Sequence, residues 1–253
     1  MDLGLRGLKA IVSGGTKGIG RAIVDTLAAE GAHVALCARQ ATEVDATLAA
    51  LRTQGATVVG RALDVGDAPA LQAWVTDAAR ELGGLDIVIA NVSALAIPST
   101  EDNWRKEFEV DLMHTVRMVT TAMPYLEQSL HPAIVTISSV SGREIDFAAG
   151  PYGAFKAALI HYTQGLAYQL ANKSIRANTV SPGNTYFPGG VWQQIEHGNP
   201  QLFKDALALN PTGRMGTPQE MANAVVFLAS PAASFVTGTN LVVDGALTRG
   251  VQF

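Results

Sequence analysis

Cysteine is nearly absent from the sequence, which holds only Cys37. An intrachain disulfide and a cysteine-based zinc site both need more than one cysteine, so the sequence excludes both. The five histidines are scattered and show no H-E-x-x-H or similar spacing. We therefore expect no metal site and a reducing compartment, the cytoplasm, although a secreted protein without disulfides would share this composition.

Long apolar runs and blocks of like charge are also missing. No segment approaches the roughly 20 apolar residues that a membrane-spanning helix needs, and the N-terminal MDLGLRGLKAIVSGG lacks the apolar core of a signal peptide. Charged residues make up only 16% of the chain, the net charge is −4, and no long basic block occurs. We therefore expect a soluble protein that binds neither a membrane nor nucleic acid.

The residues that are abundant indicate an α/β fold. Apolar residues make up 48% of the 253 residues and glycine supplies 25 of them, whereas aromatics reach only 6%. Short runs rich in Val and Ile alternate with longer amphipathic stretches, which predicts parallel strands joined by crossover helices. Strands are expected near 8–13, 33–38, 57–63, 85–90, 133–138, 175–180 and 239–243. Helices are expected near 18–30, 43–54, 68–82, 101–126, 152–171 and 218–228.

Right-handed crossovers predict a doubly wound parallel sheet of the Rossmann type, with about seven strands and helices on both faces. We expect a single domain over residues 1–253, with ligands at the carboxyl ends of the strands. The segment at about 184–211 interrupts the alternation, because several prolines surround one short helix expected at 191–197. An insertion at a strand's carboxyl end is typical of a substrate loop or lid.

A glycine-rich turn, S-G-G-T-K-G-I-G at 13–20, follows the first expected strand and opens a helix. Its glycines allow a sharp turn and a close approach to a pyrophosphate, and the helix N-terminus faces the negative charge. A plain glycine-rich turn is the alternative interpretation. We expect six residues of this loop to bind a dinucleotide: Gly14, Thr16, Lys17, Gly18, Ile19 and Gly20.

The end of the second expected strand indicates which dinucleotide binds. An NAD-binding protein usually places an acidic residue there for the ribose 2′-hydroxyl, but this chain has Ala38 and Arg39. Ala38 leaves room for a 2′-phosphate and Arg39 can bind it, with Lys17 as a second positive charge. We therefore expect NADP(H), with NAD(H) as the alternative if both cations are ordinary surface residues.

Three further residues suggest acid–base chemistry. Tyr152 and Lys156 are spaced i and i+4 on an expected helix, so they share one face. A tyrosine hydroxyl has a pKa of about 10, and a nearby ammonium lowers that pKa toward the range in which the group can exchange protons. Ser139 closes a strand and can donate to a carbonyl oxygen on which charge develops. The Y-x-x-x-K spacing alone would be an ordinary helix surface; its place after a dinucleotide loop gives it meaning.

Ordered motifs make almost the whole chain resemble the classical short-chain dehydrogenase/reductase family, including its 3-oxoacyl-carrier-protein reductases. They are S-G-G-T-K-G-I-G at 13–20, L-D-V at 63–65, A-N-V-S at 90–93, I-S-S-V-S-G at 137–142, Y-G-A-F-K at 152–156, N-T-V-S-P-G at 178–183, G-R-M-G at 213–216 and V-D-G-A at 243–246. The resemblance implies that Ser139 polarises a carbonyl, that Tyr152 is the general acid or base, and that Lys156 tunes Tyr152 and binds the nicotinamide ribose. It also implies a homotetramer built partly from helices near 101–128 and 152–171.

The resemblance assigns further cofactor contacts. Asp64 and Val65 would contact the adenine, and Asn91 would support the sheet beside the cofactor. Pro182 and Gly183 would turn the chain beside the nicotinamide. Thr185 is a candidate for its carboxamide or phosphate.

The chain departs from the family pattern at Asp111, where the family usually has an asparagine that anchors a proton-relay water. An aspartate lacks the amide donors and carries charge, so it can pair with Lys156 and shape the pH optimum, unless it is a tolerated near-isostere. Val92 and Ser93 bring side chains to a place that the family leaves bare. Phe187 stands where the family has threonine, within an aromatic and proline-rich segment that closes over the substrate or packs on the core.

These residues predict an NADPH-dependent reductase that converts a ketone to a secondary alcohol, reversibly. The alternatives are an NAD-dependent secondary-alcohol dehydrogenase and a catalytically silent NADP(H)-binding regulator. A carrier-protein substrate stays open, because Lys173 and Arg176 are basic where such a partner would bind but residues 129–132 are not. The expected substrate pocket is mostly apolar: Ser93, Leu95, Glu144, Ile145, Phe147, Tyr186, Phe187 and Trp192.

Overall fold

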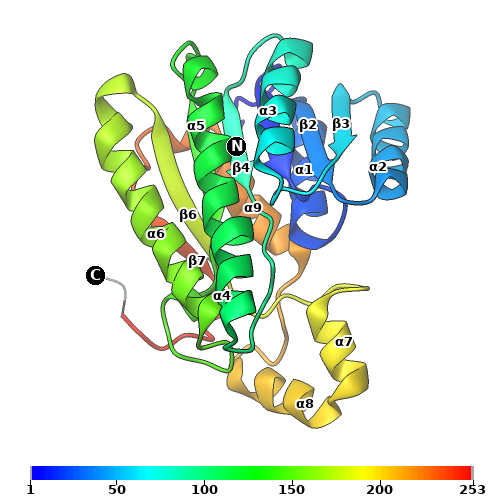
Figure 1. Ribbon diagram of the computed structural model, residues 1–253, viewed down its shortest axis with the longest axis vertical. Coiled ribbons are helices and arrows are strands. Elements are labelled where there is room, and N and C mark those ends of the chain that lie inside the picture. Colours follow the sequence, from blue (N-terminus) through cyan, green and yellow to red (C-terminus); the bar gives the residue numbers. More distant parts are fainter. Residues whose placement is uncertain (1, 252–253) are drawn as a thin grey trace.

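A computed structural model describes residues 2–251 and shows one twisted parallel sheet (Figure 1). Its seven strands lie in the order β3-β2-β1-β4-β5-β6-β7. Each strand is rich in apolar residues because helices cover both faces of the sheet. The strands are β1 (Lys9–Ser13), β2 (His33–Ala38), β3 (Val58–Ala62), β4 (Ile87–Ala90), β5 (Ala133–Ile137), β6 (Arg176–Pro182) and β7 (Asn240–Val243). The doubly wound fold expected from the sequence is confirmed.

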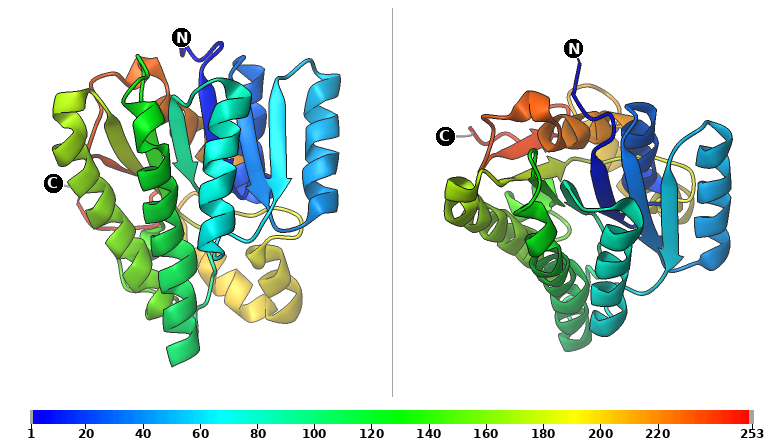
Figure 2. Two further views of the ribbon diagram at one scale, coloured as in Figure 1. Left: turned by 45° about the horizontal axis from the view of Figure 1, so that its top comes forward. Right: turned by 90° about the horizontal axis from the view of Figure 1, so that it is seen from above.

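The helices form two layers, one on each face of the sheet (Figure 2). One layer is α1 (Gly18–Ala29), α2 (Ala41–Thr53) and α9 (Pro218–Ala229), and the other is α3 (Ala68–Leu82), α5 (His114–Leu126) and α6 (Pro151–Leu170). Each layer closes a separate apolar core against the sheet. The strands are thereby held rigidly, and their carboxyl ends form a fixed edge for a binding site.

The helix expected at 101–126 is continuous in space but not uniform. It consists of α4 (Glu101–Glu107), a π-helical segment at Phe108–Met113, and α5. A single wider turn keeps the helix axis, so apolar periodicity does not reveal it. The wider turn contains Asp111, and π-helical turns are frequent at functional sites.

The segment 184–211 holds two helices where the sequence predicted one. The expected helix is α7 (Val191–Gly198), and the additional one is α8 (Pro200–Leu209). Pro200 occupies the first turn of α8, where a missing N–H costs nothing, and Asn199 caps the helix by accepting from the Leu202 amide at 3.2 Å. The prolines of this segment suggested an irregular loop, but Pro200 begins a helix. Both helices stand beyond the carboxyl ends of the strands (Figure 1).

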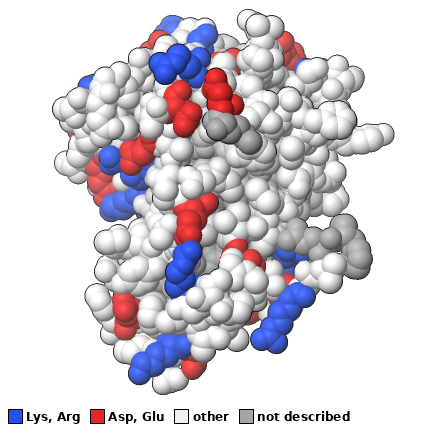
Figure 3. Space-filling model, turned by 180° about the vertical axis from the view of Figure 1, so that it is seen from behind, with Lys and Arg blue, Asp and Glu red and all other residues white. Residues whose placement is uncertain are grey.

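Two surface properties bear on partners. None of the helices within residues 2–251 combines the length and the apolar character needed to cross a membrane. On the face shown in Figure 3, the described Lys and Arg side chains are scattered among uncharged and acidic residues rather than gathered into one patch.

Candidate active site

A cleft of about 280 Å³ opens at the carboxyl edge of the sheet. The glycine loop after β1, the ends of β4, β5 and β6, and helix α7 all contribute to its wall. The strand order reverses between β1 and β4, which are neighbours in the sheet. The crevice at such a switch point is where ligands bind in doubly wound sheets.

The glycine loop is held tightly beneath this cleft. Gly14 has φ +70°, which favours glycine, and a Cβ at Gly20 would collide with the Gly14 carbonyl oxygen. Asn91, at the end of β4, donates its side-chain amide to the carbonyl oxygens of Ser13 at 3.1 Å and Gly14 at 3.3 Å. The bare backbone of the loop therefore has one fixed shape, and Lys17, Gly18, Ile19 and Gly20 line the cleft.

The sequence did not identify the acidic neighbour of Lys17. The Lys17 ammonium lies 2.6 Å from Oε1 of Glu43, on the first turn of α2, and the Thr16 hydroxyl donates to Oε2 of Glu43 at 3.1 Å. These contacts, with a smaller contribution from the charge of Arg39, lower the pKa of Glu43. Arg39 is exposed at the end of β2. A carboxylate thus shares the region in which the sequence predicted only positive charge.

The remaining predicted cofactor residues follow the same sheet edge. Pro182, Gly183 and Thr185 line the cleft beyond β6, and the Thr185 hydroxyl donates to the Gly183 carbonyl at 3.0 Å. Asp64 and Val65 come directly after β3; Asp64 accepts from the Gly66 amide at 2.9 Å and Val65 is buried. Five of the predicted cofactor residues do not line the cleft itself: Gly14, Thr16, Arg39, Asp64 and Val65.

Ser139, Tyr152 and Lys156 meet on one wall of the cleft. Ser139 follows β5, Tyr152 lies in the first turn of α6, and Lys156 lies one turn further on. The Lys156 ammonium donates to the Ile137 carbonyl at 3.0 Å and lies 5.6 Å from the centre of the Tyr152 ring. The lysine charge is therefore held against the tyrosine by the end of β5.

A short chain of hydroxyls extends from Ser139 away from Tyr152. The Ser139 hydroxyl donates to the Ser141 hydroxyl at 3.3 Å, and Ser141 donates to Asp146 at 2.6 Å. The Ser141 backbone amide also donates to the Ser139 oxygen at 3.2 Å. Asp146 thus orients the serine pair, a role for which the sequence carried no recognisable spacing.

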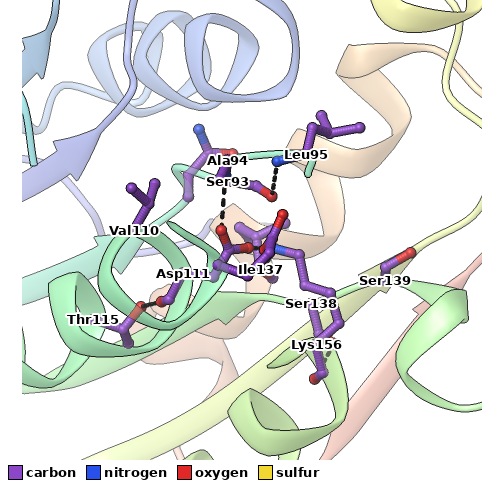
Figure 4. A network of polar contacts seen from close by, with 12 residues as sticks. Ser93, Ala94, Leu95, Val110, Asp111, Thr115, Ile137, Ser138, Ser139 and Lys156 are labelled. Atoms are coloured by element: carbon purple, nitrogen blue, oxygen red, sulfur yellow. Dashed lines mark hydrogen bonds and ion pairs between the residues drawn. The ribbon is translucent and has the colours of Figure 1, made fainter. Parts of the chain in front are cut away.

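Asp111 forms an ion pair with Lys156 inside the protein (Figure 4). Its Oδ2 lies 2.9 Å from Nζ of Lys156, and the Asp111 side chain is fully buried. Burial alone would raise the pKa of Asp111, but the Lys156 charge and hydrogen bonds from Glu107 and Ala94 outweigh burial and lower it. Burial likewise opposes the Lys156 charge, yet Asp111 reverses the balance and the pKa of Lys156 is raised.

The ion pair limits how far Lys156 lowers the pKa of Tyr152. Burial raises the pKa of Tyr152, and the charge of Lys156 and the hydroxyl of Ser139 lower it only in part. The charge of Asp111 adds to the rise. Tyr152 therefore holds its proton at neutral pH, as a general acid must.

Two buried titratable side chains beside Asp111 were not singled out from the sequence, Glu107 and His114. The ring of His114 contacts the Val110 carbonyl through Nδ1 and the Ser13 hydroxyl through Nε2, both at 2.9 Å. Because a carbonyl only accepts, Nδ1 carries the proton. Burial lowers the pKa of His114 to about 4, so the ring is neutral and connects the π-helical segment to β1.

The residues predicted for the substrate pocket divide between the cleft and other places. Ser93, Leu95, Phe147, Phe187 and Trp192 line the cleft, and the Phe187 ring lies against Gly18 of the glycine loop. The other three predicted residues, which are Glu144, Ile145 and Tyr186, do not.

These three residues lie elsewhere, and two of them have other hydrogen-bond partners. Glu144 and Ile145 border a neighbouring cavity of about 280 Å³ under the C-terminal segment, and Glu144 accepts from the Gly250 amide at 3.0 Å. The Tyr186 hydroxyl turns away and donates to Glu196 at 2.5 Å. The direction in which a loop side chain turns depends on tertiary contacts that the sequence does not show.

The basic residues considered for a carrier protein are not free surface cations. Arg176 is only 9% exposed, because its guanidinium donates to carbonyl oxygens at the end of α9, including those of Leu228 at 2.6 Å and Ser230 at 2.9 Å. It begins β6, at the opposite end of that strand from the cleft. Lys173 is paired with Glu127 at 2.6 Å. The expectation that Arg176 offers its charge where a carrier protein would bind was wrong.

The glycine loop generates the first prediction. In Gly20→Ala the new methyl group displaces the Gly14 carbonyl, so we expect dinucleotide binding to weaken at least about tenfold, or roughly 1.4 kcal/mol. Fluorescence titration with NADPH measures this change. Gly165→Ala is the matched control, because a Cβ at Gly165 meets nothing within 4 Å. Equal affinities in the two variants would show that the loop does not bind the dinucleotide.

Comparison with known proteins is consistent with this geometry. A family model described as "Enoyl-(Acyl carrier protein) reductase" matches residues 14–248. The isoepoxydon dehydrogenase patN of Penicillium expansum is 40% identical over 260 residues, which cover 100% of this chain and 99% of that protein. Dehydrogenase/reductase SDR family member 4 of Sus scrofa is 34% identical over 93% of this chain and 85% of its own length.

Solved structures have the same fold. A short-chain dehydrogenase/reductase from Burkholderia xenovorans superposes with a TM-score of 0.90 at 36% identity, over 96% of this chain and 97% of its own. An NADPH-bound short chain oxidoreductase from Pseudomonas aeruginosa PAO1, described as containing an atypical catalytic center, gives 0.88 at 30% identity, over 96% and 98%. The ordered motifs, the cleft and these relatives together show that the chain belongs to the short-chain dehydrogenase/reductase family, whose members are oxidoreductases that use a nicotinamide cofactor.

Proposed function

We propose that this protein is an NADP(H)-dependent oxidoreductase that reduces a ketone to a secondary alcohol, reversibly, with Tyr152 as the acid or base. The observation that carries the proposal is the meeting of Ser139, Tyr152 and Lys156 on the wall of a cleft floored by the glycine loop. A catalytically silent regulator would not need all three side chains at one surface, so the proposal favours an enzyme.

The residues of the cleft fit a dinucleotide. The glycine loop at 17–20 lines the same cleft as Tyr152 and Lys156, and a Cβ at Gly20 would collide with the Gly14 carbonyl oxygen, so the loop stays bare backbone at the start of α1. Gly14, Gly18 and Gly20 would hold the pyrophosphate, and Lys156 the nicotinamide ribose. When bound, the cofactor supplies the hydride, and the protein supplies position and charge.

In reduction, Ser139 donates a hydrogen bond to the carbonyl oxygen on which negative charge develops. Tyr152 gives its proton to that oxygen, and Lys156 stabilises the phenolate that results. Burial raises the pKa of Tyr152, so the phenol carries the proton that this step transfers. In oxidation the same phenolate removes the alcohol proton.

The apolar wall of the cleft supports a ketone with hydrophobic or cyclic bulk. Leu95, Phe147, Phe187 and Trp192 provide that wall, and the Phe147 and Trp192 rings lie 5.6 Å apart, edge to face. The segment 184–211 carries the last two of these residues into the cleft, which supports its assignment as a substrate lid on a single domain.

A cytoplasmic homotetramer is part of the proposal. Trp104 and Phe108 are 39% and 41% exposed, and their rings lie 5.9 and 6.0 Å from that of Phe155 on α6. Exposed aromatic side chains on adjacent long helices support an interface there. Burial of Cys37, whose pKa is raised to about 12, keeps the single thiol unreactive and is compatible with a reducing compartment.

The activity is tested by following NADPH oxidation with a panel of β-ketoesters, acyl thioesters, cyclic ketones and aryl ketones. We expect turnover with at least one class and a loss of about 100-fold or more in Tyr152→Phe, because general acid catalysis contributes that much. Isoepoxydon is tested as an alcohol substrate with NADP⁺, following the name of the relative from Penicillium expansum. Tight NADPH binding without turnover across the panel would favour the regulator.

Cofactor preference is tested at the end of β2. Arg39→Asp removes the expected 2′-phosphate contact and adds a charge that repels it, so the ratio of kcat/KM for NADPH over NADH should fall at least about tenfold. Lys106→Asp, an equal charge reversal on exposed α4, is the control. Glu43 beside Lys17 favours the NAD-dependent alternative, and an unchanged ratio in Arg39→Asp would support that alternative.

The role of Asp111 is tested by the pH dependence of alcohol oxidation. Its charge raises the pKa of Tyr152, so in Asp111→Asn the rate should rise with pH about one unit earlier than in the wild type. Asp102→Asn, an exposed carboxylate at the start of α4, is the control. Identical pH–rate profiles for Asp111→Asn and the wild type would make Asp111 a tolerated near-isostere.

A further inference from the structure

Glu107 is a second buried carboxyl group behind the catalytic residues. It is the last residue of α4, one turn before Asp111, and its exposed fraction is 0%. Buried carboxyl groups without a structural or functional partner are rare because their desolvation is costly. The function proposed above does not use Glu107, so its contacts need an explanation.

Glu107 and Asp111 both bind the segment that follows β4. Glu107 Oε1 accepts from the Ala96 amide at 2.5 Å, and Asp111 Oδ1 accepts from the Ala94 amide at 2.8 Å. Leu95 lies between these amides with φ +53°, a conformation that most residues avoid, and its side chain lines the cleft. The two carboxyl groups therefore hold one wall of the substrate pocket in a strained conformation.

The second oxygen of Glu107, Oε2, is buried and receives no hydrogen bond from the described residues, and the Asp111 carboxyl group is its charged neighbour. A hydrogen bond between carboxyl groups needs one proton, and Asp111 is the ionised partner because it faces Lys156 at 2.9 Å. Burial, together with the Asp111 charge, raises the pKa of Glu107 to about 8. The other titratable groups facing this pair are Lys156 and Tyr152 on α6, together with the neutral His114 on α5.

We propose that Glu107 is a positioning residue: its Oε1 holds Leu95 at the substrate through the Ala96 amide, and its buried proton holds the Asp111 carboxylate toward Lys156, so that one side chain sets both the pocket and the catalytic charge. This inference rests on the proposed function of the same site. When Glu107 ionises, the hydrogen bond to Asp111 is lost and a second negative charge stands near Tyr152, which raises its pKa further.

The buried proton is tested first without any substrate. Infrared difference spectra of the whole protein, recorded between pH 6 and 10, should show the carbonyl stretch of a protonated carboxylic acid that disappears near pH 8. Glu107→Gln should lack this titrating band, and Glu101→Gln, an exposed carboxylate on the same helix, should retain it. A wild-type spectrum without the band would mean that Glu107 is ionised and would overturn the proposal.

The effect on chemistry is tested by alcohol oxidation in Glu107→Gln. Glutamine keeps an acceptor for the Ala96 amide but cannot ionise, so the rise of kcat with pH should move about one unit lower than in the wild type. Glu101→Gln should leave the profile in place. A purely structural Glu107 would change stability without moving the profile, and an unmoved profile would overturn the proposal.

Comparing Glu107→Met with Glu107→Gln separates the effect of Glu107 on the substrate pocket from its effect on the charges. Without the acceptor for the Ala96 amide, Leu95 is no longer held, so KM for the ketone should rise about tenfold while the Kd for NADPH stays within about twofold. In Glu107→Gln, which keeps an acceptor for the Ala96 amide, KM for the ketone should equal that of the wild type. Equal KM values in the wild type and Glu107→Met would refute the pocket role. If no ketone is turned over but the infrared band titrates, the proposed function fails and the buried proton stands.

Discussion

The buried ion pair between Lys156 and Asp111 is the interaction on which the rest of the active site depends. Burial opposes the charge of Lys156, and Asp111 offsets that cost, so the lysine charge is held where it can stabilise the Tyr152 phenolate. Because the charge of Asp111 also raises the pKa of Tyr152, the ion pair sets how much of the lysine's effect reaches the tyrosine. Its balance sets the acid–base character of the site.

This pair is joined to the cofactor loop through the protein interior. The Ser13 hydroxyl, at the end of β1, accepts from the backbone N–H of Asn91 at 3.0 Å and contacts His114, which in turn contacts the Val110 carbonyl next to Asp111. The ends of two central strands and the π-helical segment therefore share one hydrogen-bonded frame. A shift of the glycine loop would be transmitted to the helix that carries Asp111, so the glycine loop and the Lys156–Asp111 ion pair keep a common geometry.

The sequence predicted most of what depends on local pattern. Strand positions, the glycine loop and the wall formed by Ser139, Tyr152 and Lys156 follow from apolar runs and fixed spacings, and the structure brings those residues together. Glu107 carries the correct i, i+4 spacing to Asp111, which was a usable signal. It was missed because an acidic residue on an amphipathic helix is usually exposed, and only the folded chain, in which Glu107 accepts from the Ala96 amide, shows that it is buried.

Other errors arose where tertiary contacts decide. Tyr186 turns to Glu196, Arg176 turns into the carbonyl ends of α9, and Glu43 reaches back to Lys17. Each of these contacts joins residues whose relative position is fixed by the folded chain and not by sequence spacing. Helix α8 was missed because a local signal is ambiguous and not because of a tertiary contact. A proline is equally typical of a loop and of the first turn of a helix.

The way in which Leu95 is held has a consequence for how such a site diversifies. Glu107 and Asp111 bind the backbone amides on either side of it, at Ala96 and Ala94, and neither contacts the side chain at position 95 through these bonds. These backbone hydrogen bonds therefore do not depend on which side chain stands at position 95. Substitutions at this position can therefore reshape the wall of the cleft while the buried ion pair behind it stays unchanged, so the shape of the cleft and its charges can change independently.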